Sequence, residues 1–383
     1  MVINPVKFAH THQAQLIAFY LPQYHPIPEN DTWWGKGFTE WTNVTKAKPL
    51  FPGHYQPHLP ADLGFYDLRL PETRQAQADL ASKYGIYGFC YYHYWFNGRR
   101  VLERPFTEVL SSGEPDFPFC LCWANENWTR AWDGQDRQIL LEQKYSDEDD
   151  KNHICQLAEA FSDKRYIRVN GKPLFLIYRT AKLPNPQRTL SLWREEAQKL
   201  GIGELFIGRV ESNFTEERTD PTEFGFDAAI EFQPDVFNLG IPLQQGRRWR
   251  LAQKLGLANI AYSKNLVFDY EQVVNHMLQK PQPTYTRFPC VTPFWDNTAR
   301  RKNGAVILAN ATPELYEQWL SKVGVKAAQK PTDQNIIFVN AWNEWAEGCH
   351  LEPCQKWGLA YLEATQRALA IIKTSQQIKI RQE

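Results

Sequence analysis

Two glutamates near the end of the chain, Glu344 and Glu347, have the types and the spacing that chemistry on sugars requires. They follow a short apolar run, Ile336–Val339, which is typical of a buried strand. Trp342 and Trp345 flank Glu344 in the sequence. Glycoside chemistry uses one carboxyl group to protonate a leaving oxygen, a second as base or nucleophile, and flat apolar surfaces against sugar rings. This stretch supplies all three.

The expected electrostatics of the pair favour catalysis over a structural role. If the backbone becomes helical after the strand, positions i and i+3 project to the same side. Desolvation by the tryptophans would raise the pKa of one carboxyl group and suit it as general acid, while the other stays ionised. The structural alternative, in which one glutamate caps a turn and the other forms a surface salt bridge, stays open.

Other residues at predicted strand ends are candidates for substrate contacts. Glu126, which follows Asn125, could be the catalytic acid/base in place of the Glu344 and Glu347 pair, or it could orient the substrate. The same two roles are open to Glu40, which lies in an aromatic loop. Single histidines are plausible partners for sugar hydroxyls, although a lone histidine is more often packed. Asp296 and Arg300 belong to a charged stretch. This stretch either binds a charged substituent of the substrate or is a solvated loop. The expected substrate-binding residues are Tyr24, His25, Trp34, Glu40, Trp41, Tyr92, His93, Trp95, Trp123, Asn125, Glu126, Trp128, Trp295, Asp296, Trp342 and Asn343.

The elements that must position these residues alternate short apolar strands with amphipathic stretches, the signature of βαβ units around a parallel sheet. The eight predicted strands are Leu16–Leu21, Tyr87–Tyr92, Phe117–Cys122, Pro173–Tyr178, Leu205–Val210, Ala228–Phe232, Phe288–Pro293 and Ile336–Val339. Nearly every strand is followed by aromatic and polar residues, which is where a (β/α)8 barrel gathers its active site. We therefore predict an α/β fold: a single TIM-barrel domain over residues 1–383 with long βα loops, an N-terminal arm at 1–14 and a flexible tail at 374–383. The segment Pro26–Phe65 is predicted to be a long functional loop.

Composition narrows the functional classes. Lys+Arg and Asp+Glu both number 43, and this zero net charge argues against nucleic-acid or anionic-membrane partners. The chain has no phosphate-cradling glycine loop, no G-x-S-x-G elbow and no metal-binding histidine spacing, so we expect neither cofactor nor metal. Most of the seven cysteines lie in apolar runs. No signal-peptide or membrane-spanning run is visible, which predicts a cytoplasmic protein with reduced thiols.

Four ordered motifs carry a resemblance to a known family. They are Ala18-Phe19-Tyr20-Leu21-Pro22-Gln23-Tyr24-His25, Trp34-Gly35-Lys36-Gly37-Phe38-Thr39-Glu40-Trp41, Trp123-Ala124-Asn125-Glu126-Asn127-Trp128 and Asn343-Glu344-Trp345-Ala346-Glu347-Gly348. From about Leu16 to Pro353 the chain resembles WbsX-type proteins, often labelled polysaccharide-biosynthesis glycosyltransferases and related to the family-99 glycoside hydrolases. Those hydrolases are endo-acting α-mannosidases, in which an Asn-Glu-Trp-x-Glu-Gly motif carries both catalytic carboxylates. The resemblance implies a (β/α)8 barrel.

Carried over to this chain, the resemblance implies that Glu344 deprotonates the 2-hydroxyl of the sugar, giving a retaining route through a 1,2-anhydro sugar. Glu347 would protonate the leaving group and then activate water. The hydrolases have a histidine between the two glutamates, and Ala346 stands there in this chain. A substrate contact is therefore missing, so mannose specificity does not carry over.

The sequence thus predicts a retaining glycoside hydrolase or transglycosidase that acts on a surface polysaccharide or related oligosaccharide. One alternative is a glycosyltransferase for O-antigen-type polysaccharide. Against this alternative, the chain has no recognisable site for a nucleotide diphosphate. Its cluster of Arg247, Arg248 and Arg250 could hold a diphosphate or could form an exposed basic turn. The other alternative is a non-catalytic glycan-binding barrel. Sugar identity, linkage and oligomeric state are left undetermined by the sequence.

Overall fold

The barrel strands of the computed structural model, which describes residues 14–130, 135–212, 218–255, 264–329 and 334–380, are all parallel and run in chain order around a ring. They are β1 (Gln15–Tyr20), β2 (Gly88–Phe96), β4 (Phe119–Trp123), β8 (Lys172–Ile177), β9 (Phe206–Glu211), β10 (Ala228–Glu231), β12 (Arg287–Phe288), β13 (Cys290–Val291) and β15 (Ile336–Val339). The ring closes where β15 pairs with β1, with Gln15 opposite Ile336 and Ala18 opposite Val339. The predicted (β/α)8 barrel is confirmed.

The seventh barrel strand is interrupted at Pro289, where the sequence predicts one continuous strand. β12 pairs only with β10, whereas β13 pairs with β15. Pro289 has no N–H to donate to a ladder, but its carbonyl accepts a hydrogen bond from Phe338 N at 2.8 Å. β12 and β13 together therefore make one broken strand that completes the barrel wall.

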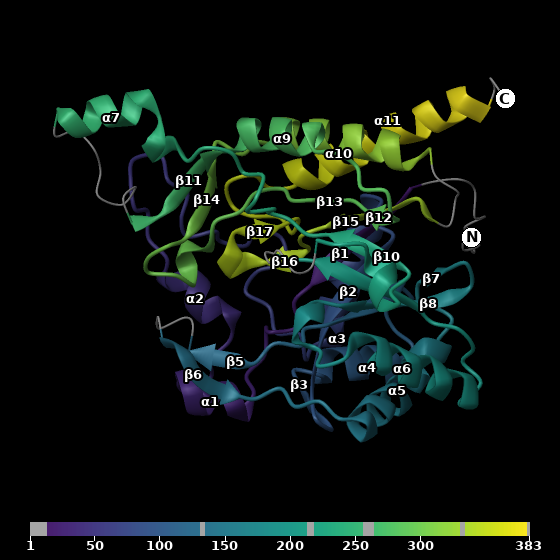
Figure 1. The fold of residues 1–383 in the computed structure, drawn as a ribbon. Coiled ribbons are helices and arrows are strands. Elements are labelled where there is room, and N and C mark those ends of the chain that lie inside the picture. Colours follow the sequence, from purple (N-terminus) through teal and green to yellow (C-terminus); the bar gives the residue numbers. More distant parts are fainter. Residues whose placement is uncertain (1–13, 131–134, 213–217, 256–263, 330–333, 381–383) are drawn as a thin grey trace, which may run out of the picture.

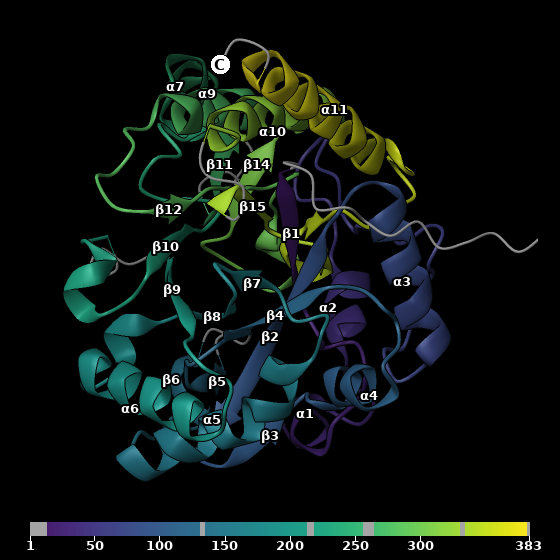
Figure 2. The same ribbon diagram turned by 90° about the vertical axis from the view of Figure 1, so that its right-hand side faces the viewer.

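Helices surround the strands, as Figure 2 shows for α3, α5, α6, α10 and α11. The outer helices are α3 (Pro71–Lys83), α4 (Arg104–Ser112), α5 (Asp147–Ser162), α6 (Pro186–Lys199), α9 (Tyr270–Gln279), α10 (Pro313–Ala327) and α11 (Ala360–Ile380). Ser146 caps the start of α5, since its hydroxyl accepts a hydrogen bond from Asp149 N at 3.1 Å. Between β9 and β10 the described residues hold only the short 3-10 turn η4 (Pro221–Phe224). Helix α11 continues through residues 374–380, for which the sequence predicts a flexible tail.

The connections that follow the strands carry further elements, which cluster on the side of the barrel where the strands end (Figure 1). The predicted loop Pro26–Phe65 contains two helices, α1 (Pro28–Trp34) and α2 (Glu40–Lys46). The other elements there are β3 (Arg99–Val101), β5 (Trp128–Arg130), β6 (Gln135–Leu141), η2 (Thr180–Lys182), η5 (Leu243–Gln245), α7 (Arg247–Lys254), β11 (Leu266–Asp269), η6 (Asn297–Ala299), β14 (Val306–Ala309), β16 (Asn343–Glu344), η8 (Trp345–Glu347) and β17 (Cys349–His350). By contrast, β7 (Arg168–Val169) leads into β8 and pairs antiparallel with the first residues of that strand.

An aromatic layer fills the barrel near the ends of its strands. The Phe19 ring is fully buried, and its centroid lies 5.6 Å from Tyr92, 5.7 Å from Phe232 and 5.4 Å from Phe338. Rings of this kind bury large apolar area and pack at these separations. The layer closes the barrel interior beneath the strand ends.

Three features of the described residues bear on function. Their seven cysteines are all free, and only Cys155 is exposed. Within those same residues no cluster of histidine, cysteine and acidic side chains could hold a metal ion. A separate search of the described helices found none that is both long enough and apolar enough to span a bilayer.

Candidate active site

The glutamate stretch is anchored to the end of β1 by Asn343. Its side-chain oxygen accepts from Leu21 N at 2.7 Å, and its amide nitrogen donates to Leu21 O at 3.0 Å. Tyr24 donates a hydrogen bond from its hydroxyl to the Asn343 carbonyl. These bonds tie the segment after β15 to the segment after β1. Glu344, the next residue, is therefore attached to a firmly held part of the barrel rim.

A single 3-10 turn, η8, then separates the two glutamates, and Gly348 ends it with a left-handed φ of +51°. A Cβ at this position would lie 2.9 Å from the Asp296 carbonyl oxygen, so only glycine fits. Asp296 N also donates to Glu347 O at 2.8 Å. The turn is thereby held against the chain that follows β13, which fixes the direction of Glu347.

Arg300 joins three carboxylates at the centre of the site. Its guanidinium lies 2.7 Å from Glu40 Oε1, 3.0 Å from Glu344 Oε2 and 2.7 Å from Glu347 Oε1. The Arg300 side chain is only 13% exposed. Burial opposes its charge, but the three carboxylates outweigh that effect and raise the pKa of Arg300 well above its usual value. One cation therefore holds both candidate catalytic groups.

The carboxylates differ in how firmly they keep a proton. Burial raises the pKa of Glu344 to about 8; Arg300 opposes this shift, while the charges of Glu347 and Glu40 add to it. Burial likewise raises the pKa of Glu40, again opposed by Arg300. Three carboxylates around one cation carry an excess of negative charge, and one proton held within the cluster relieves it at neutral pH.

Glu344, Glu347 and Arg300 line a cleft of about 870 Å³ at this end of the barrel. A volume of this size is typical of sites for small or oligomeric ligands. The cleft combines aromatic faces with charged and amide groups. Its lining includes Gln23, Trp33, Trp34, Tyr92, Tyr94, Asn125, Glu126, Trp128, Gln143, Tyr145, Tyr178, Arg179, Lys182, Phe232, Trp295 and Arg301.

The structure brings eight of the sequence-predicted site residues together in this cleft. They are Trp34, Tyr92, Asn125, Glu126, Trp128, Trp295, Glu344 and Glu347. Glu126 is 42% exposed and pairs with Arg179, whose backbone N–H donates to Asn125 Oδ1 at 2.7 Å. Glu126 thus has a cation of its own and stands apart from the Arg300 cluster. Glu40 lies behind the cleft wall, fully buried against Arg300.

The other predicted site residues have partners inside the fold and do not line this cleft. His93 Nε2 lies 2.9 Å from His153 Nε2, and Trp95 Nε1 donates to both Asp149 oxygens at 3.0 Å. Trp41 Nε1 donates to a backbone carbonyl at 2.8 Å. The residues in this group are Tyr24, His25, Trp41, His93, Trp95, Trp123, Trp342 and Asn343, all buried. Asp296 lines a different pocket and lies 2.5 Å from His54 Nε2.

Sequence reasoning missed two groups that shape the site. Arg300 could be noticed only as part of a charged loop, and nothing local indicates three acidic partners, because Glu40 is 260 positions away. Glu352 was not singled out, although it lies beneath the glutamate turn. Its oxygens accept from Trp345 Nε1 at 2.7 Å, Tyr66 Oη at 2.8 Å and Gln77 Nε2 at 2.6 Å.

Glu352 yields a stability prediction. Leucine at this position would leave three buried donors without an acceptor, so Glu352→Leu is expected to lower the free energy of unfolding by about 3 kcal/mol or more. Burial raises the pKa of Glu352 to about 7 in the folded state, so the stability it adds is present below pH 4.5 and is lost as pH rises through 7. Urea unfolding at pH 5 and pH 8.5 measures both effects. Glu352→Gln, the control, should lose less stability and show a weaker pH dependence; an equal loss in both variants would contradict this account.

The structure defines a class: (β/α)8 barrels with an acidic, aromatic cleft at the ends of their strands. The profile of the family described as Glycosyltransferase WbsX matches residues 16–365, and the chain belongs to that family. The WxcX protein of Xanthomonas campestris pv. campestris (strain B100), described as uncharacterized, is 46% identical over 357 residues. That match covers 93% of this chain but 50% of the relative, so the chain spans about half the length of this curated relative.

Solved structures share the fold at low sequence identity. The GH99 endo-alpha-mannosidase from Bacteroides thetaiotaomicron superposes with a TM-score of 0.54 and 15% identity, covering 95% of this chain and 98% of that one. A glycoside hydrolase-like protein superposes with a TM-score of 0.57 and 12% identity, covering 96% and 97%. The sequence-based resemblance to WbsX-type proteins is therefore confirmed, together with its barrel fold.

Proposed function

We propose that the protein cleaves or transfers a glycan with retention of anomeric configuration, using Glu344 and Glu347 as its catalytic carboxylates. The observation that carries this proposal is their common position: both line one cleft and both contact the same guanidinium of Arg300. Both groups face a cleft of about 870 Å³, and burial there raises the pKa of Glu344, a combination typical of functional sites. Aromatic faces around them suit stacking against sugar rings.

The proposed chemistry is balanced within the pair. In the reactive form the single proton of the pair lies on Glu347 and Glu344 is ionised. Glu344 removes the proton of the sugar 2-hydroxyl, and O2 attacks the anomeric carbon as the glycosidic bond breaks. Glu347 gives its proton to the leaving oxygen, so that a 1,2-anhydro sugar remains. Glu347 then takes a proton from water or from an acceptor hydroxyl, which opens the three-membered ring at the anomeric carbon, and Glu344 returns its proton to O2. Two inversions give net retention.

The aromatic residues of the cleft supply positioning. Trp33 and Trp34 come from α1, and Trp128 from the start of β5, so they stand on connections above the barrel. Tyr92 lies in β2 and Tyr178 follows β8, and both are nearer the aromatic layer, with ring centroids 6.2 Å apart. Sugar units held between these two sets would present a glycosidic oxygen near Glu347.

The test is an assay of the purified protein on bacterial polysaccharides of the O-antigen type. New reducing ends report cleavage, and proton NMR of the first-formed product gives its anomeric configuration. We expect the product to keep the configuration of the substrate. An inverted product would exclude the 1,2-anhydro route, because a single displacement at the anomeric carbon would then have occurred.

The pKa of Glu344 predicts the alkaline limit of activity. Catalysis requires the pair to hold one proton, and that proton is lost as pH rises through about 8. We therefore expect kcat/KM to fall roughly tenfold per pH unit above about pH 8.5. The measurement is kcat/KM from pH 5 to pH 10 on any glycan that the protein cleaves. A profile that falls already above pH 6 would contradict the raised pKa of Glu344.

A glycosyltransferase using the same cleft is the second candidate, and cationic residues of the lining favour it. Arg301 and Lys182 are exposed there, and such groups attract a donor diphosphate. Arg247 and Arg250 are exposed on α7 and do not line this cleft; the side chain of Arg248 lies outside the described residues. Thermal shift with nucleotide sugars separates the candidates: stabilisation by one of them, with no cleavage of any glycan, favours the transferase.

A further inference from the structure

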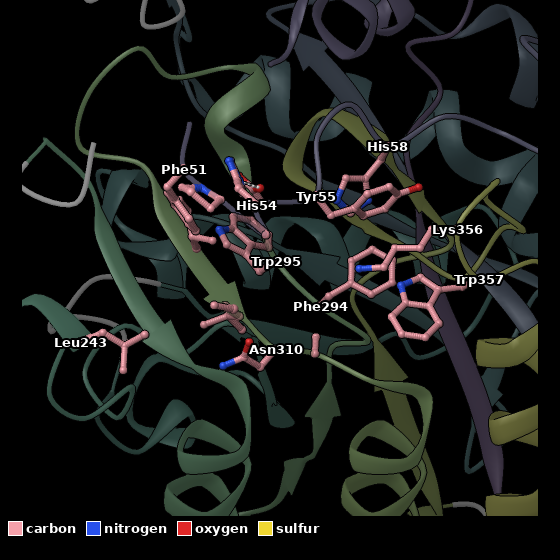
Figure 3. A pocket seen from close by; sticks show the side chains of 18 of the residues that line it. Phe51, His54, Tyr55, His58, Leu243, Phe294, Trp295, Asn310, Lys356 and Trp357 are labelled. Carbon is pink, nitrogen blue, oxygen red and sulfur yellow. Dashed lines mark hydrogen bonds and ion pairs between the residues drawn. The ribbon is translucent and has the colours of Figure 1, made fainter. Parts of the chain in front are cut away.

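A second pocket of about 230 Å³ lies beside the cleft, and the chemistry proposed above does not use it. Figure 3 shows its side chains converging from separate stretches of the chain: the segment after α2, the residues after β13 and β14, and the approach to α11. The lining includes Phe51, His54, Tyr55, His58, Phe294, Trp295, Asn310, Lys356, Trp357 and Tyr361.

Several aromatic rings line the pocket. The Phe294 and Tyr361 centroids lie 4.8 Å apart with the rings near perpendicular, and Trp357 lies 5.9 Å from Tyr361 in a similar arrangement. Lys356 places its ammonium group 4.6 Å from the Tyr55 ring and 4.8 Å from the Trp357 ring. Trp357 is only partly buried, so part of the wall faces solvent.

Three polar atoms of residues in this wall have no hydrogen-bond partner among the described residues: the hydroxyls of Tyr55 and Tyr361 and the indole nitrogen of Trp295. Tyr361 and Trp295 are themselves only 3% and 6% exposed. Buried polar groups are nearly always paired, so each unpaired one needs an explanation. A ligand with hydroxyl groups would satisfy them.

The pocket is physically joined to the proposed catalytic turn. Trp295 is the one described residue that lines both the pocket and the cleft. Gly348, which follows Glu347 directly, lines the pocket as well, and the backbone of Asp296 donates to the Glu347 carbonyl. A molecule in this pocket would lie against the opposite side of the segment that holds Glu347.

We propose that this pocket is an accessory binding site for one pyranose residue of a glycan. A pyranose presents apolar C–H faces to aromatic rings and hydroxyl groups to unpaired donors, and this wall offers both. The volume is below the roughly 300–1,000 Å³ of pockets that enclose drug-sized ligands, so it suits one ring rather than an oligosaccharide or a whole nucleotide. This proposal rests on the carbohydrate-active family and not on Glu344 and Glu347 being catalytic.

The experiment measures binding without turnover, in the protein with Glu344→Gln and Glu347→Gln together. The probes are methyl glycosides of glucose, mannose, galactose, N-acetylglucosamine and glucuronic acid, followed by saturation-transfer NMR and located by crystal soaking. Three further substitutions are added singly. Trp357→Ala removes a pocket wall, Trp33→Ala removes a cleft wall, and Phe237→Ala removes an exposed ring that belongs to neither.

At least one glycoside is expected in the pocket, with hydroxyl groups bonded to Trp295 Nε1 or Tyr361 Oη. Trp357→Ala should weaken its binding about fivefold to tenfold, while Trp33→Ala and Phe237→Ala leave it unchanged. Ala311→Phe, which fills the pocket from a partly buried position, should act like Trp357→Ala and guards against misfolding of that variant.

Three outcomes overturn the proposal. No glycoside of the panel binds; or binding is lost in Trp33→Ala and kept in Trp357→Ala; or uridine or guanosine monophosphate occupies the pocket in preference to the sugars. The last outcome would assign the pocket to a nucleotide donor. Failure of the cleavage assay, by contrast, leaves the binding result untouched, because the tested protein lacks both glutamates.

Discussion

Replacing Glu347 by glutamine is expected to reduce kcat/KM on a natural glycan by roughly 10²–10⁴-fold, the usual contribution of a positioned acid or base. Glutamine keeps the shape and one contact to Arg300 but cannot give a proton to the leaving oxygen. Glu344→Gln should cause a loss of similar size, because the 2-hydroxyl then keeps its proton. Both variants are measured with the same substrate at pH 7.

The matched control is Glu126→Gln. Glu126 lines the same cleft but is 42% exposed and pairs with Arg179, so its loss should weaken binding and raise KM more than it lowers kcat. If Glu126→Gln abolishes turnover while Glu347→Gln is active, the proposed acid is wrong and Glu126 takes that role. Circular dichroism of all three variants excludes unfolding as the cause.

A leaving group that needs no proton separates the roles of the two glutamates. Fluoride leaves the anomeric carbon without acid assistance, so Glu347→Gln should recover most of its kcat/KM, which reports the first step, on a glycosyl fluoride. Glu344→Gln should stay inactive on the same substrate, since the 2-hydroxyl must still be deprotonated. If Glu344→Gln alone recovered activity on the glycosyl fluoride, Glu344 would be the acid and Glu347 the base. This comparison is needed because a shared proton gives the same pH profile in either arrangement.

The barrel could be predicted from the sequence because its strands are short apolar runs, and the amphipathic and polar stretches between them can be recognised from neighbouring residues alone. Ile336–Val339 is buried on both faces, as a barrel strand must be, and its composition shows it directly. The break at Pro289 could not be foreseen from composition, since it depends on which neighbours β12 and β13 find across the wall. Helices α1 and α2 were missed because each has only seven residues and is stabilised by tertiary packing.

The candidate site could be predicted only in part from the sequence, because some of its residues meet only in the folded barrel. Glu344 and Glu347 are neighbours in sequence, and the strand that precedes them indicates their place on the rim. Arg300 follows the seventh strand and Glu40 follows the first, so only closure of the barrel brings them together. Aromatic residues such as His93 and Trp123 have the right types at strand ends, but alternate side chains point away from the cleft.

Arg300 provides the most severe test of the site electrostatics. Arg300→Leu removes the cation and leaves three buried carboxylates in mutual repulsion, which is expected to lower the free energy of unfolding by about 3–5 kcal/mol at pH 8. Without Arg300 the pKa of Glu344 should rise above its wild-type value of about 8, because the one effect that lowers it is gone. The folded state then binds more protons than the unfolded state, so the loss of stability grows as pH rises.

The measurement is urea unfolding of wild type and Arg300→Leu at pH 5.5 and pH 8. We expect the difference between the two proteins to be smaller at pH 5.5, where protonated carboxyl groups no longer repel. Glu40→Gln is the rescue, because Glu40 is the most deeply buried of the three and its neutral form removes one charge from the cluster. Added to Arg300→Leu, it should restore part of the stability at pH 8. A destabilisation that is equal at both pH values and unaffected by Glu40→Gln would mean that Arg300 contributes packing, and that the charge balance argued for Glu344 does not hold.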